Sequence, residues 1–571
     1  MTKLAVRVAT KLDGGEAILE AFRRLGIDYV ISSPGSEWAP VWEAFARQKV
    51  DGLAGPTYID CWHETLAVDM AIGYSRVTGR LQAVLLHAGA GLLQGMAGVM
   101  AAQHAEVPLI VMSGEALTYG EDPDFEPGQQ WFANLSVVGG THRLVEPLVK
   151  WSTQATSVHT LYGMVVRAGE MAQRTPAGPT FLNVPIETML APWAPKTKVR
   201  DVPPAPITRP TDADIERIAD LIVAAERPVI TTDSIGRTAE GMAALVELAE
   251  LMAAPVVDGH SCMYANFPKD NPLYIGFDLH TAAKSADLVL LVQNRVPWYP
   301  QRSRPDATVV AIDDSPLKLF MVHQSLQADH YLEGDPASTL RLLSAAVRAR
   351  KMNPARREER AAGVKRQHDA MVEKLRAAER NVADAAPIDP IALVAALNDA
   401  LPANAVYVDE LTVHRNTAQH HLNWNLPQSY FYVNGGLGQG IGLALGVKLA
   451  QRERPVVLMI GDGSFLYNPA MQALGASKEN DLPLLIVVFN NTAYEAMRNN
   501  HRRYYPEGVA ATHDLWHGVH IDGPDYAEFA KPFGLHGERV EDPARLKGAL
   551  ADALAAVAGG RTAILNVMLS R

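Results

Sequence analysis

Two polar motifs in the C-terminal part of the chain combine residue types that can hold a divalent cation. Residues 461–464 (GDGS) follow the apolar run VVLMI, and residues 490–491 (NN) follow the apolar run LLIVVF. Both runs have the length and β-branched composition of buried strands, and one helix length separates them. In a parallel sheet the two motifs would meet at the carboxyl ends of neighbouring strands, where α/β proteins bind ligands.

The residue types in these motifs suit magnesium and a diphosphate. The Asp462 carboxylate, the Asn491 amide oxygen and a nearby backbone carbonyl form an all-oxygen set, which Mg2+ prefers and completes with water and phosphate oxygens. The glycines let a diphosphate approach the backbone, and a helix N-terminus predicted after Ser464 would favour an anion. Either motif alone is usually a turn, but both at the ends of successive strands predict a metal–diphosphate site.

A glycine-rich segment upstream permits a second interpretation. Residues 433–446 (VNGGLGQGIGLALG) follow a predicted strand and lead into a predicted helix. Such a segment could be a dinucleotide fingerprint, although the signal is weak by itself. This interpretation predicts a nucleotide-dependent oxidoreductase that binds NAD(P)H, and it leaves the two polar motifs without a role.

Length and composition set limits on the class of protein. The 571 residues exceed one hydrophobic core, so two to four domains are expected. The net charge is -11 without a basic block, which argues against nucleic acid as a partner. Two cysteines exclude a disulfide framework, and apolar runs such as PLLIVVF are far shorter than the roughly 20 residues of a membrane span. We expect a cytoplasmic protein with no membrane partner.

Strand-like and helical patterns alternate along nearly the whole chain, which predicts parallel sheets with helices on both faces. A proline-rich stretch over residues 187–210 reads as a linker, and the charged stretch 348–380 reads as a solvated helix and connector. The fold class expected is therefore α/β, with three doubly wound parallel-sheet domains. Their predicted ranges are 1–190, 200–350 and 385–571.

The GDG…NN pair resembles the cofactor motif of the thiamine-diphosphate-dependent enzymes. The resemblance implies that Asp462, Asn491 and the backbone carbonyl of Ala493 hold Mg2+, and that Gly463 and Ser464 contact the diphosphate. It also implies a pyrimidine-binding N-terminal domain, a central domain and a diphosphate-binding C-terminal domain. The segment around residues 467–469 is about two residues longer than in common members, so the local start of the helix is open.

The same resemblance extends to other segments of the predicted third domain. Gly435 and Leu437 match the GGLG segment that passes under the cofactor, with Leu437 as the bulky residue wedged between its two rings. Thr412, in the DELT segment, matches a threonine that contacts the cofactor. Tyr494 begins a segment, YEAMR, that is similar to YGALR of the decarboxylases. Without the GDG…NN motif, Leu437 would read as an ordinary core leucine.

The first domain carries residues that resemble the catalytic set of the family. Thiamine chemistry requires loss of a ring proton, which a carboxylate beside the aminopyrimidine promotes. Glu64, in the sequence HE before a predicted helix, resembles that carboxylate. Ser36, in SPGS, and His87, in LHAGAG, resemble the substrate-binding serine and the proton-transferring histidine of benzoylformate decarboxylase-like enzymes. Each residue alone also fits a structural role, such as a helix-start glutamate or a strand-end histidine.

Two observations leave the reaction and the cofactors of the central domain open. The segment 296–300 (VPWYP) lies where the decarboxylases have a second histidine, and it contains none. Asp313 ends a strand as a nucleotide-binding acid would, but the fuller FAD signature of some relatives is absent, so FAD is not expected. The acidic loop 121–126 reads as a solvated loop rather than a calcium site.

The resemblance implies a thiamine-diphosphate- and magnesium-dependent lyase that decarboxylates a 2-oxo acid, with carboligation to a 2-hydroxy ketone as a further reaction. An acetolactate-synthase-like carboligase is the nearest alternative. The dinucleotide-dependent oxidoreductase and a binding subunit without activity remain alternatives of other classes. The family also implies a homodimer or a dimer of dimers, in which Glu64 of one subunit meets the diphosphate site of another.

Overall fold

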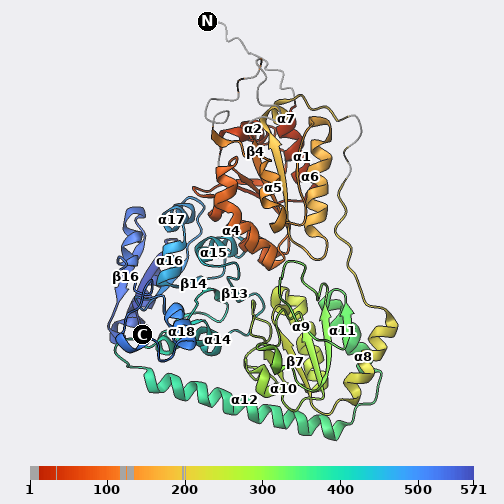
Figure 1. Cartoon of the computed structure of the whole chain (residues 1–571), viewed down its shortest axis with the longest axis vertical. Helices are drawn as coiled ribbons and strands as arrows, with labels where there is room; N and C mark the ends of the chain where they lie inside the picture. Colours follow the sequence, from red (N-terminus) through yellow and green to blue (C-terminus); the bar gives the residue numbers. More distant parts are fainter. Residues whose placement is uncertain are drawn as a thin grey trace. The chain divides into compact units, whose positions relative to one another are not determined.

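The chain folds into three parallel α/β sheets, as a computed structural model shows for residues 12–33, 35–115, 124, 126, 134–195, 199 and 201–570 (Figure 1). It divides into two compact units, residues 1–205 and residues 206–571. The first unit contains one sheet and the second contains two. The predicted fold class is therefore confirmed.

The first unit has a six-stranded sheet in which all paired strands are parallel. Its strands, in spatial order, are β2 (Thr57–Asp60), β1 (Tyr29–Ser32), β3 (Gln82–Leu86), β4 (Leu109–Glu115), β6 (Pro179–Pro185) and β5 (Ser152–Gln154). The helices of this unit are α1 (Gly14–Leu25), η1 (Ser36–Trp38), α2 (Ala39–Val50), α3 (Glu64–Thr78), α4 (Ala90–Ala105), α5 (Thr141–Val145), η3 (Glu146–Leu148), α6 (Val158–Gln173) and α7 (Ile186–Leu190).

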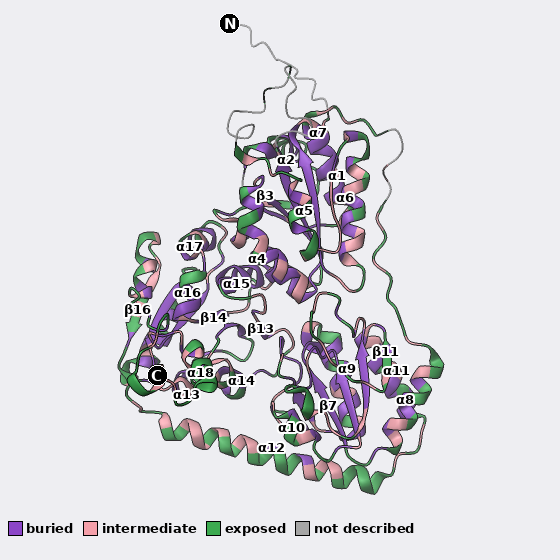
Figure 2. Cartoon of the chain, viewed as in Figure 1, coloured by how far each residue is buried: buried purple, intermediate pink, exposed green. Residues whose placement is uncertain are grey.

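Alternation along strand β3 explains why helices cover both faces of this sheet. Leu85 belongs to the core formed with α1 and α6, whereas Leu86 points toward α4, close to Gly95. Helix α1 has the ends that its sequence predicts, because the Asp13 side chain caps its first turn and Gly26 ends it in the left-handed conformation. The buried faces of these helices are visible in Figure 2.

The second unit begins with a five-stranded parallel sheet. Its strands, in spatial order, are β11 (His330–Glu333), β10 (Thr308–Asp313), β9 (Leu288–Val292), β7 (Pro228–Thr232) and β8 (Val256–Asp258). Its helices are α8 (Asp212–Ala224), η4 (Ile235–Arg237), α9 (Ala239–Met252), α10 (Leu279–Ala283), η5 (Gln301–Ser303) and α11 (Pro336–Arg348).

The other sheet of the second unit carries the polar motifs and is also parallel throughout. Its strands, in spatial order, are β13 (Tyr430–Tyr432), β12 (Val406–Glu410), β14 (Val456–Gly461), β15 (Leu485–Asn490), β17 (Ala563–Met568) and β16 (His536–Val540). Its helices are α13 (Pro390–Ala400), α14 (Arg415–His421), α15 (Gly440–Ala450), α16 (Asp462–Tyr467), α17 (Ala470–Glu479), α18 (Glu495–Tyr504), α19 (Val509–His513), η6 (Tyr526–Phe533) and α20 (Pro543–Ala558).

The first and last sheets share one strand order, in which the first strand lies between the second and the third. The chain thus winds away in opposite directions from β1 and β3 in one sheet, and from β12 and β14 in the other. Crevices at such reversal points are where open α/β sheets bind ligands. The predicted functional residues follow these strands: Ser36 and His87 follow β1 and β3, and Thr412 and Asp462 follow β12 and β14.

The charged stretch predicted as a solvated helix is α12 (Pro354–Val382), in which only Val364 and His368 are buried. This prediction is confirmed. Within the second unit, the two sheets are joined by direct contacts: Arg415 of α14 donates to the Cys262 carbonyl at 2.9 Å, and Lys269 donates to the Leu422 carbonyl at 2.6 Å. Helix α14, which follows Thr412, is therefore held from the central sheet.

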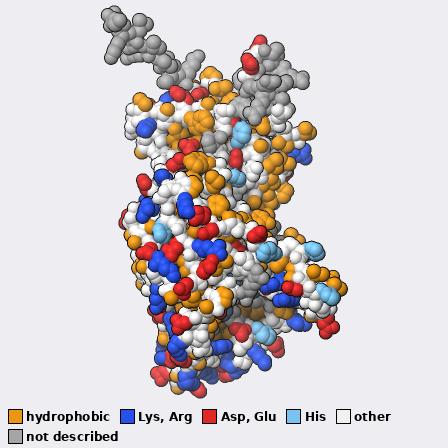
Figure 3. All heavy atoms as spheres, turned by 90° about the vertical axis from the view of Figure 1, so that its left-hand side faces the viewer, with side chains coloured by type: hydrophobic (Ala, Val, Ile, Leu, Met, Phe, Trp, Pro, Cys, Tyr) orange, Lys and Arg blue, Asp and Glu red, His pale blue; other side chains and the backbone are white. Residues whose placement is uncertain are grey.

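Two further observations concern the charge of the surface and the length of the helices. On the face drawn in Figure 3, basic and acidic side chains are interspersed among the described residues. Among the helices that the structure describes, none combines the length and apolarity needed to cross a bilayer.

Candidate active site

The two polar motifs of the second unit meet at one sheet edge, as the sequence predicts. Strands β14 and β15 pair in parallel with Gly461 opposite Phe489, so Asp462 and Asn491 follow adjacent strand ends. The backbone N–H groups of Thr492 and Ala493 lie close enough to the Asp462 carboxylate to lower its pKa, while they donate to the side chains of Asn490 and Asn491. Residues 30 positions apart in the sequence are thereby brought side by side.

The helix after the GDG motif starts earlier than predicted. Helix α16 begins at Asp462, with Gly461 in extended conformation as its N-cap, so the predicted start after Ser464 is wrong. The segment around residues 467–469 forms a break between two helices, because proline cannot supply the N–H that a continuous helix needs at that position. Asn468 and Pro469 separate α16 from α17, and the ligand candidates keep their places.

The residues present fit a bound divalent cation. Asp462 is 4% exposed, its Oδ1 accepts from the Gly463 N–H at 2.8 Å, and its buried Oδ2 has no hydrogen-bond partner. Burial raises the pKa of Asp462 to about 6, despite hydrogen bonds from neighbouring backbone N–H groups. A cation next to Oδ2 would give this oxygen its missing partner. Asn491 and Ala493 are also buried here, so three oxygen donors are available.

The second glycine of the GDG motif is required by an aromatic ring. A Cβ at Gly463 would lie 2.3 Å from the ring of Tyr494, so only glycine allows this contact. Ser464 is buried in the first turn of α16. Tyr494 immediately follows Ala493, and its N–H donates to the Val519 carbonyl at 2.7 Å, which fixes the turn after Asn491.

The glycine-rich segment forms an exposed turn that carries Leu437. Leu437 is 40% exposed between Gly436 and Gly438, which both have positive φ angles of 112° and 98°. Gly438 lies against α16, because a Cβ there would be 2.7 Å from the Tyr467 carbonyl oxygen. Leu437 is therefore exposed on a turn between two glycines, and its interpretation as an ordinary core leucine is wrong. Gly435 begins this turn and is partly exposed.

Sequence reasoning missed Glu410, the last residue of β12. Its buried carboxylate accepts hydrogen bonds from the backbone N–H groups of Gly438, Gln439 and Gly440 at 2.6–3.0 Å. The next N–H group, that of Ile441, donates to the Asn468 side chain. Four successive N–H groups at the N-terminus of α15 are therefore already bonded within the chain and are not available to a dinucleotide pyrophosphate. This geometry argues against the dinucleotide fingerprint. Thr412, two residues after Glu410, is exposed.

The catalytic candidates of the first unit also lie together. Glu64 is the first residue of α3, and His87 follows β3. A Cβ added at Gly91 would lie 2.6 Å from the Cβ of His87 and 2.9 Å from Oε1 of Glu64, so both side chains flank this glycine at the start of α4. Ser36 is exposed at the start of η1.

A buried glutamate that sequence reasoning missed pairs with His87. The Nδ1 atom of His87 lies 2.9 Å from each carboxylate oxygen of Glu37, and Glu37 also accepts from the Ala88 N–H at 2.7 Å. The Glu37 side chain is fully buried, whereas that of His87 is 24% exposed. The hydrogen bond to Glu37 raises the pKa of His87 above its usual value, and the charges of Glu37 and Glu64 add to this against the opposing effect of burial.

The His87–Glu37 pair makes a pH-dependent prediction. The folded-state pKa of His87 is raised above its value in the unfolded chain. The His87–Glu37 pair therefore contributes its full stability to the fold below about pH 6.5, and this contribution is lost as the pH rises through the folded-state pKa. We expect Glu37→Gln to lower Tm by roughly 5 °C at pH 6, from a loss of about 2 kcal/mol, and by less at pH 9. Thermal unfolding at both pH values measures this. Glu43→Gln, at an exposed site on α2, is the matched control, and an equal loss at both pH values would contradict the prediction.

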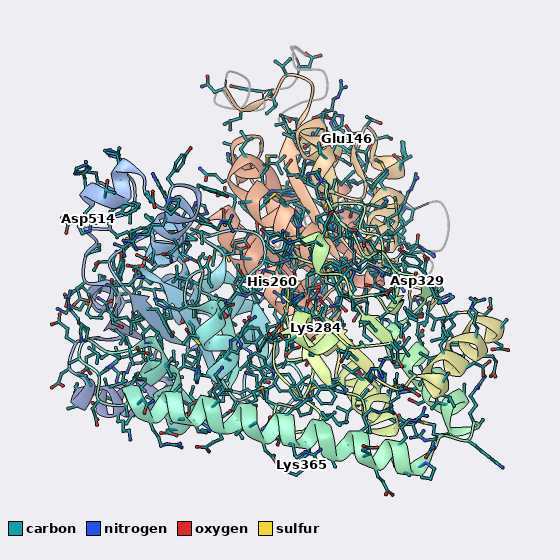
Figure 4. The ribbon with its side chains drawn as sticks, turned by 60° about the horizontal axis from the view of Figure 1, so that its bottom comes forward. Glu146, His260, Lys284, Asp329, Lys365 and Asp514 are labelled. Carbon is teal, nitrogen blue, oxygen red and sulfur yellow. The ribbon has the colours of Figure 1, made fainter. Side chains whose placement is uncertain are left out.

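The region of the missing second histidine does contain an imidazole. Tyr299, in the segment 296–300, stacks on His260, with ring centroids 5.9 Å apart and planes 11° apart. His260 lies on the loop after β8 and is labelled in Figure 4. Sequence reasoning missed it because it precedes the expected segment by some 36 positions.

Two further features of the sequence are Asp313 and the acidic loop 121–126. Asp313 is engaged by Lys318 at 3.3 Å and by the Ser315 N–H at 2.8 Å, which leaves this acid internally satisfied. The acidic loop 121–126 lies outside the described residues except for Asp124 and Glu126, and Pro34 of the SPGS segment also lies outside them.

Comparison with known proteins identifies the class of protein. Three family models match: the N-terminal TPP binding domain of thiamine pyrophosphate enzymes over residues 12–137, their central domain over 215–343, and their C-terminal TPP binding domain over 411–567. The chain belongs to the thiamine pyrophosphate enzyme family.

Relatives with different activities cover nearly the whole chain. The benzoylformate decarboxylase of Pseudomonas aeruginosa is 27% identical, with 95% of this chain and 96% of that protein covered. The large subunit of acetolactate synthase isozyme 2 of Escherichia coli is 26% identical, with 94% and 93% covered. The crystal structure of benzoylformate decarboxylase from Polynucleobacter necessarius superimposes with a TM-score of 0.79 at 22% identity, covering 98% of both chains. That structural likeness supports the fold.

Proposed function

We propose that this protein is a thiamine-diphosphate- and magnesium-dependent decarboxylase of a 2-oxo acid. The observation that carries the proposal is the His87–Glu37 pair, because the imidazole of His87 flanks Gly91 together with Glu64 and would be oriented by Glu37 for proton transfer. The likeness to benzoylformate decarboxylase over 95% of the chain supports the same reaction class. Bound thiamine diphosphate supplies an electron sink for the pair of electrons left when CO2 departs.

The residues of the second unit would hold the cofactor. Asp462, Asn491 and the carbonyl of Ala493 would bind Mg2+, which in turn binds the diphosphate. Gly463, Ser464, Gly435, Thr412 and Tyr494 would contact the cofactor, and Leu437 would pack between its rings. Support comes from the partnerless Asp462 oxygen and from the exposure of Leu437 on its turn.

The residues of the first unit would carry out the proton transfers. Glu64 would hydrogen-bond the aminopyrimidine ring and share its proton. Ser36 would donate a hydrogen bond to the substrate carboxylate, a contact that is lost with CO2. His87, oriented by Glu37, would then deliver a proton to the carbon that lost CO2, and an aldehyde would leave. From the resemblance to the family, we propose that the working site forms in a homodimer or a dimer of dimers, with Glu64 from one subunit and Asp462 from another.

Measurement of CO2 release tests the proposal. The protein is loaded with thiamine diphosphate and Mg2+ and is given a panel of aliphatic and aromatic 2-oxo acids, with and without an aldehyde acceptor. We expect CO2 and the corresponding aldehyde from at least one acid without an acceptor, and none without the cofactor. Absence of CO2 from cofactor-loaded protein under every condition would refute the assignment to 2-oxo acids.

A carboligase is the second candidate. It is favoured by the 26% identity to an acetolactate synthase large subunit across 94% of the chain. This candidate predicts that CO2 release requires a second carbonyl substrate and that the product is a 2-hydroxy ketone. Chromatography of the products from the same panel separates the two reactions.

A further inference from the structure

We propose that Glu410 and Asn468 form a positioning pair that holds the Leu437 turn and helix α16 in one fixed arrangement for the cofactor. The inference rests on the proposed cofactor, and it concerns two residues that the proposed binding set does not include. Neither side chain is offered as a ligand of the cofactor or the metal. The pair acts through the backbone that carries Leu437 and Asp462.

The carboxylate of Glu410 lies where an external anion would bind a helix. It is 3% exposed and receives four hydrogen bonds, from the N–H groups of Gly438, Gln439 and Gly440 and from the side-chain amide of Asn468 at 2.8 Å. The N-terminus of a helix attracts negative charge because its first N–H groups have no partners within the helix. Glu410 therefore closes the N-terminus of α15 with a carboxylate from a neighbouring strand.

Asn468 extends this arrangement to the metal-binding helix. Its Nδ2 group donates to Glu410 and to the Ser464 carbonyl at 2.9 Å, and its Oδ1 accepts from the Ile441 N–H at 3.0 Å. These contacts link Asn468, the C-cap of α16, to the carbonyl of Ser464 in its own helix, to strand β12 and to helix α15. The residue stands in the break between α16 and α17.

The consequence concerns the turn of residues 435–438. Gly436 and Gly438 adopt positive φ angles, so the backbone of the turn is permissive and does not fix the direction of Leu437 by itself. The Gly438 N–H makes the shortest of the Glu410 hydrogen bonds, 2.6 Å, directly after Leu437. Holding this N–H sets the exit of the turn. Asn468 of the pair also donates to the Ser464 carbonyl, two residues after Asp462, and so couples the turn to the proposed metal site.

The geometry makes specific demands on the side chain at position 410. A carboxylate offers two oxygens that only accept, which matches four converging donors. Glutamine is nearly isosteric but replaces one oxygen with an NH2 group that would face a donor. Glu410→Gln therefore disrupts the hydrogen bonds while it preserves volume, and Glu410→Ala leaves a carboxylate-sized cavity at the helix N-terminus.

Hydrogen exchange of the full-length protein without cofactor gives the first test. We expect the amides of residues 438–441 to exchange slowly in the wild type, and at least tenfold faster in Glu410→Gln and Asn468→Ala. Glu453→Gln, at an exposed site on the loop after α15, is the matched control and should leave them unchanged. Rapid exchange of these amides in the wild type would by itself overturn the proposal. The test therefore gives a result even if a variant fails to fold.

Calorimetric titration with thiamine diphosphate in the presence of Mg2+ gives the second test. We expect at least a tenfold higher Kd in both variants, while far-UV circular dichroism and Tm confirm that they are folded. Formate should fill the cavity of Glu410→Ala and restore the affinity severalfold, whereas chloride at the same ionic strength should not. Kd values within twofold of the wild type in either folded variant would overturn the proposal. Failure of the wild type to bind the cofactor would instead count against the proposed function.

Discussion

Glu64→Gln should reduce kcat for CO2 release by about a thousandfold, within the range of 10²–10⁴ that general acid–base catalysis contributes. Glu64 begins α3 beside His87, where a carboxylate can share a proton with the aminopyrimidine ring. Glutamine keeps the size and a hydrogen bond but cannot exchange a proton. Steady-state assay of the loaded enzyme with its best 2-oxo acid measures the loss.

The control for this substitution is Glu43→Gln, which removes the same charge from an exposed site in the same unit. It should retain kcat. The affinity for thiamine diphosphate should fall much less than kcat in Glu64→Gln, because the proposed contacts of the diphosphate and the metal are with residues of the second unit. A kcat within tenfold of the wild type would show that Glu64 is not the activating carboxylate.

Asp462→Ala should raise the Kd for thiamine diphosphate by more than a hundredfold and abolish its dependence on Mg2+. The side chain provides the only carboxylate among the proposed ligands Asp462, Asn491 and Ala493. The Tm of the cofactor-free protein should change little, because loss of the Oδ1 hydrogen bond from the Gly463 N–H is offset by removal of the buried Oδ2 that has no partner. Calorimetry with and without Mg2+, together with the Tm gain on loading, measures both effects.

The matched control is Asp399→Ala, at an exposed position on α13 in the same domain. It should leave cofactor affinity unchanged. Retention of a Mg2+-dependent Tm gain in Asp462→Ala would contradict the proposed metal site. The two inactive variants also test the shared site: mixing Glu64→Gln with Asp462→Ala should restore about a quarter of the wild-type activity after random subunit exchange in a symmetric dimer. No recovery, with exchange demonstrated, would contradict a site built from two subunits.

Features that depend on a short stretch of sequence, such as the strands, were predicted correctly. Continuous apolar runs marked the strands, since strands of parallel sheets are buried on both faces. Parallel order then required the residues after β14 and β15 to meet, and Asp462 does contact the backbone next to Asn491. The start of α16 was misplaced by three residues because the motif itself, with Gly461 as cap, begins the helix.

The sequence by itself determined the three-sheet α/β architecture, the pairing of GDG with NN, and the family, because hydrophobic periodicity and motif spacing are written along the chain. Only the tertiary structure decided the partners of the buried charges. Glu37 reaches His87 across 50 positions, and Glu410 reaches Asn468 across 58. Neither glutamate differs in local sequence from a solvated one. Burial and converging donors give each its role, and these arise only when distant strands and helices pack together.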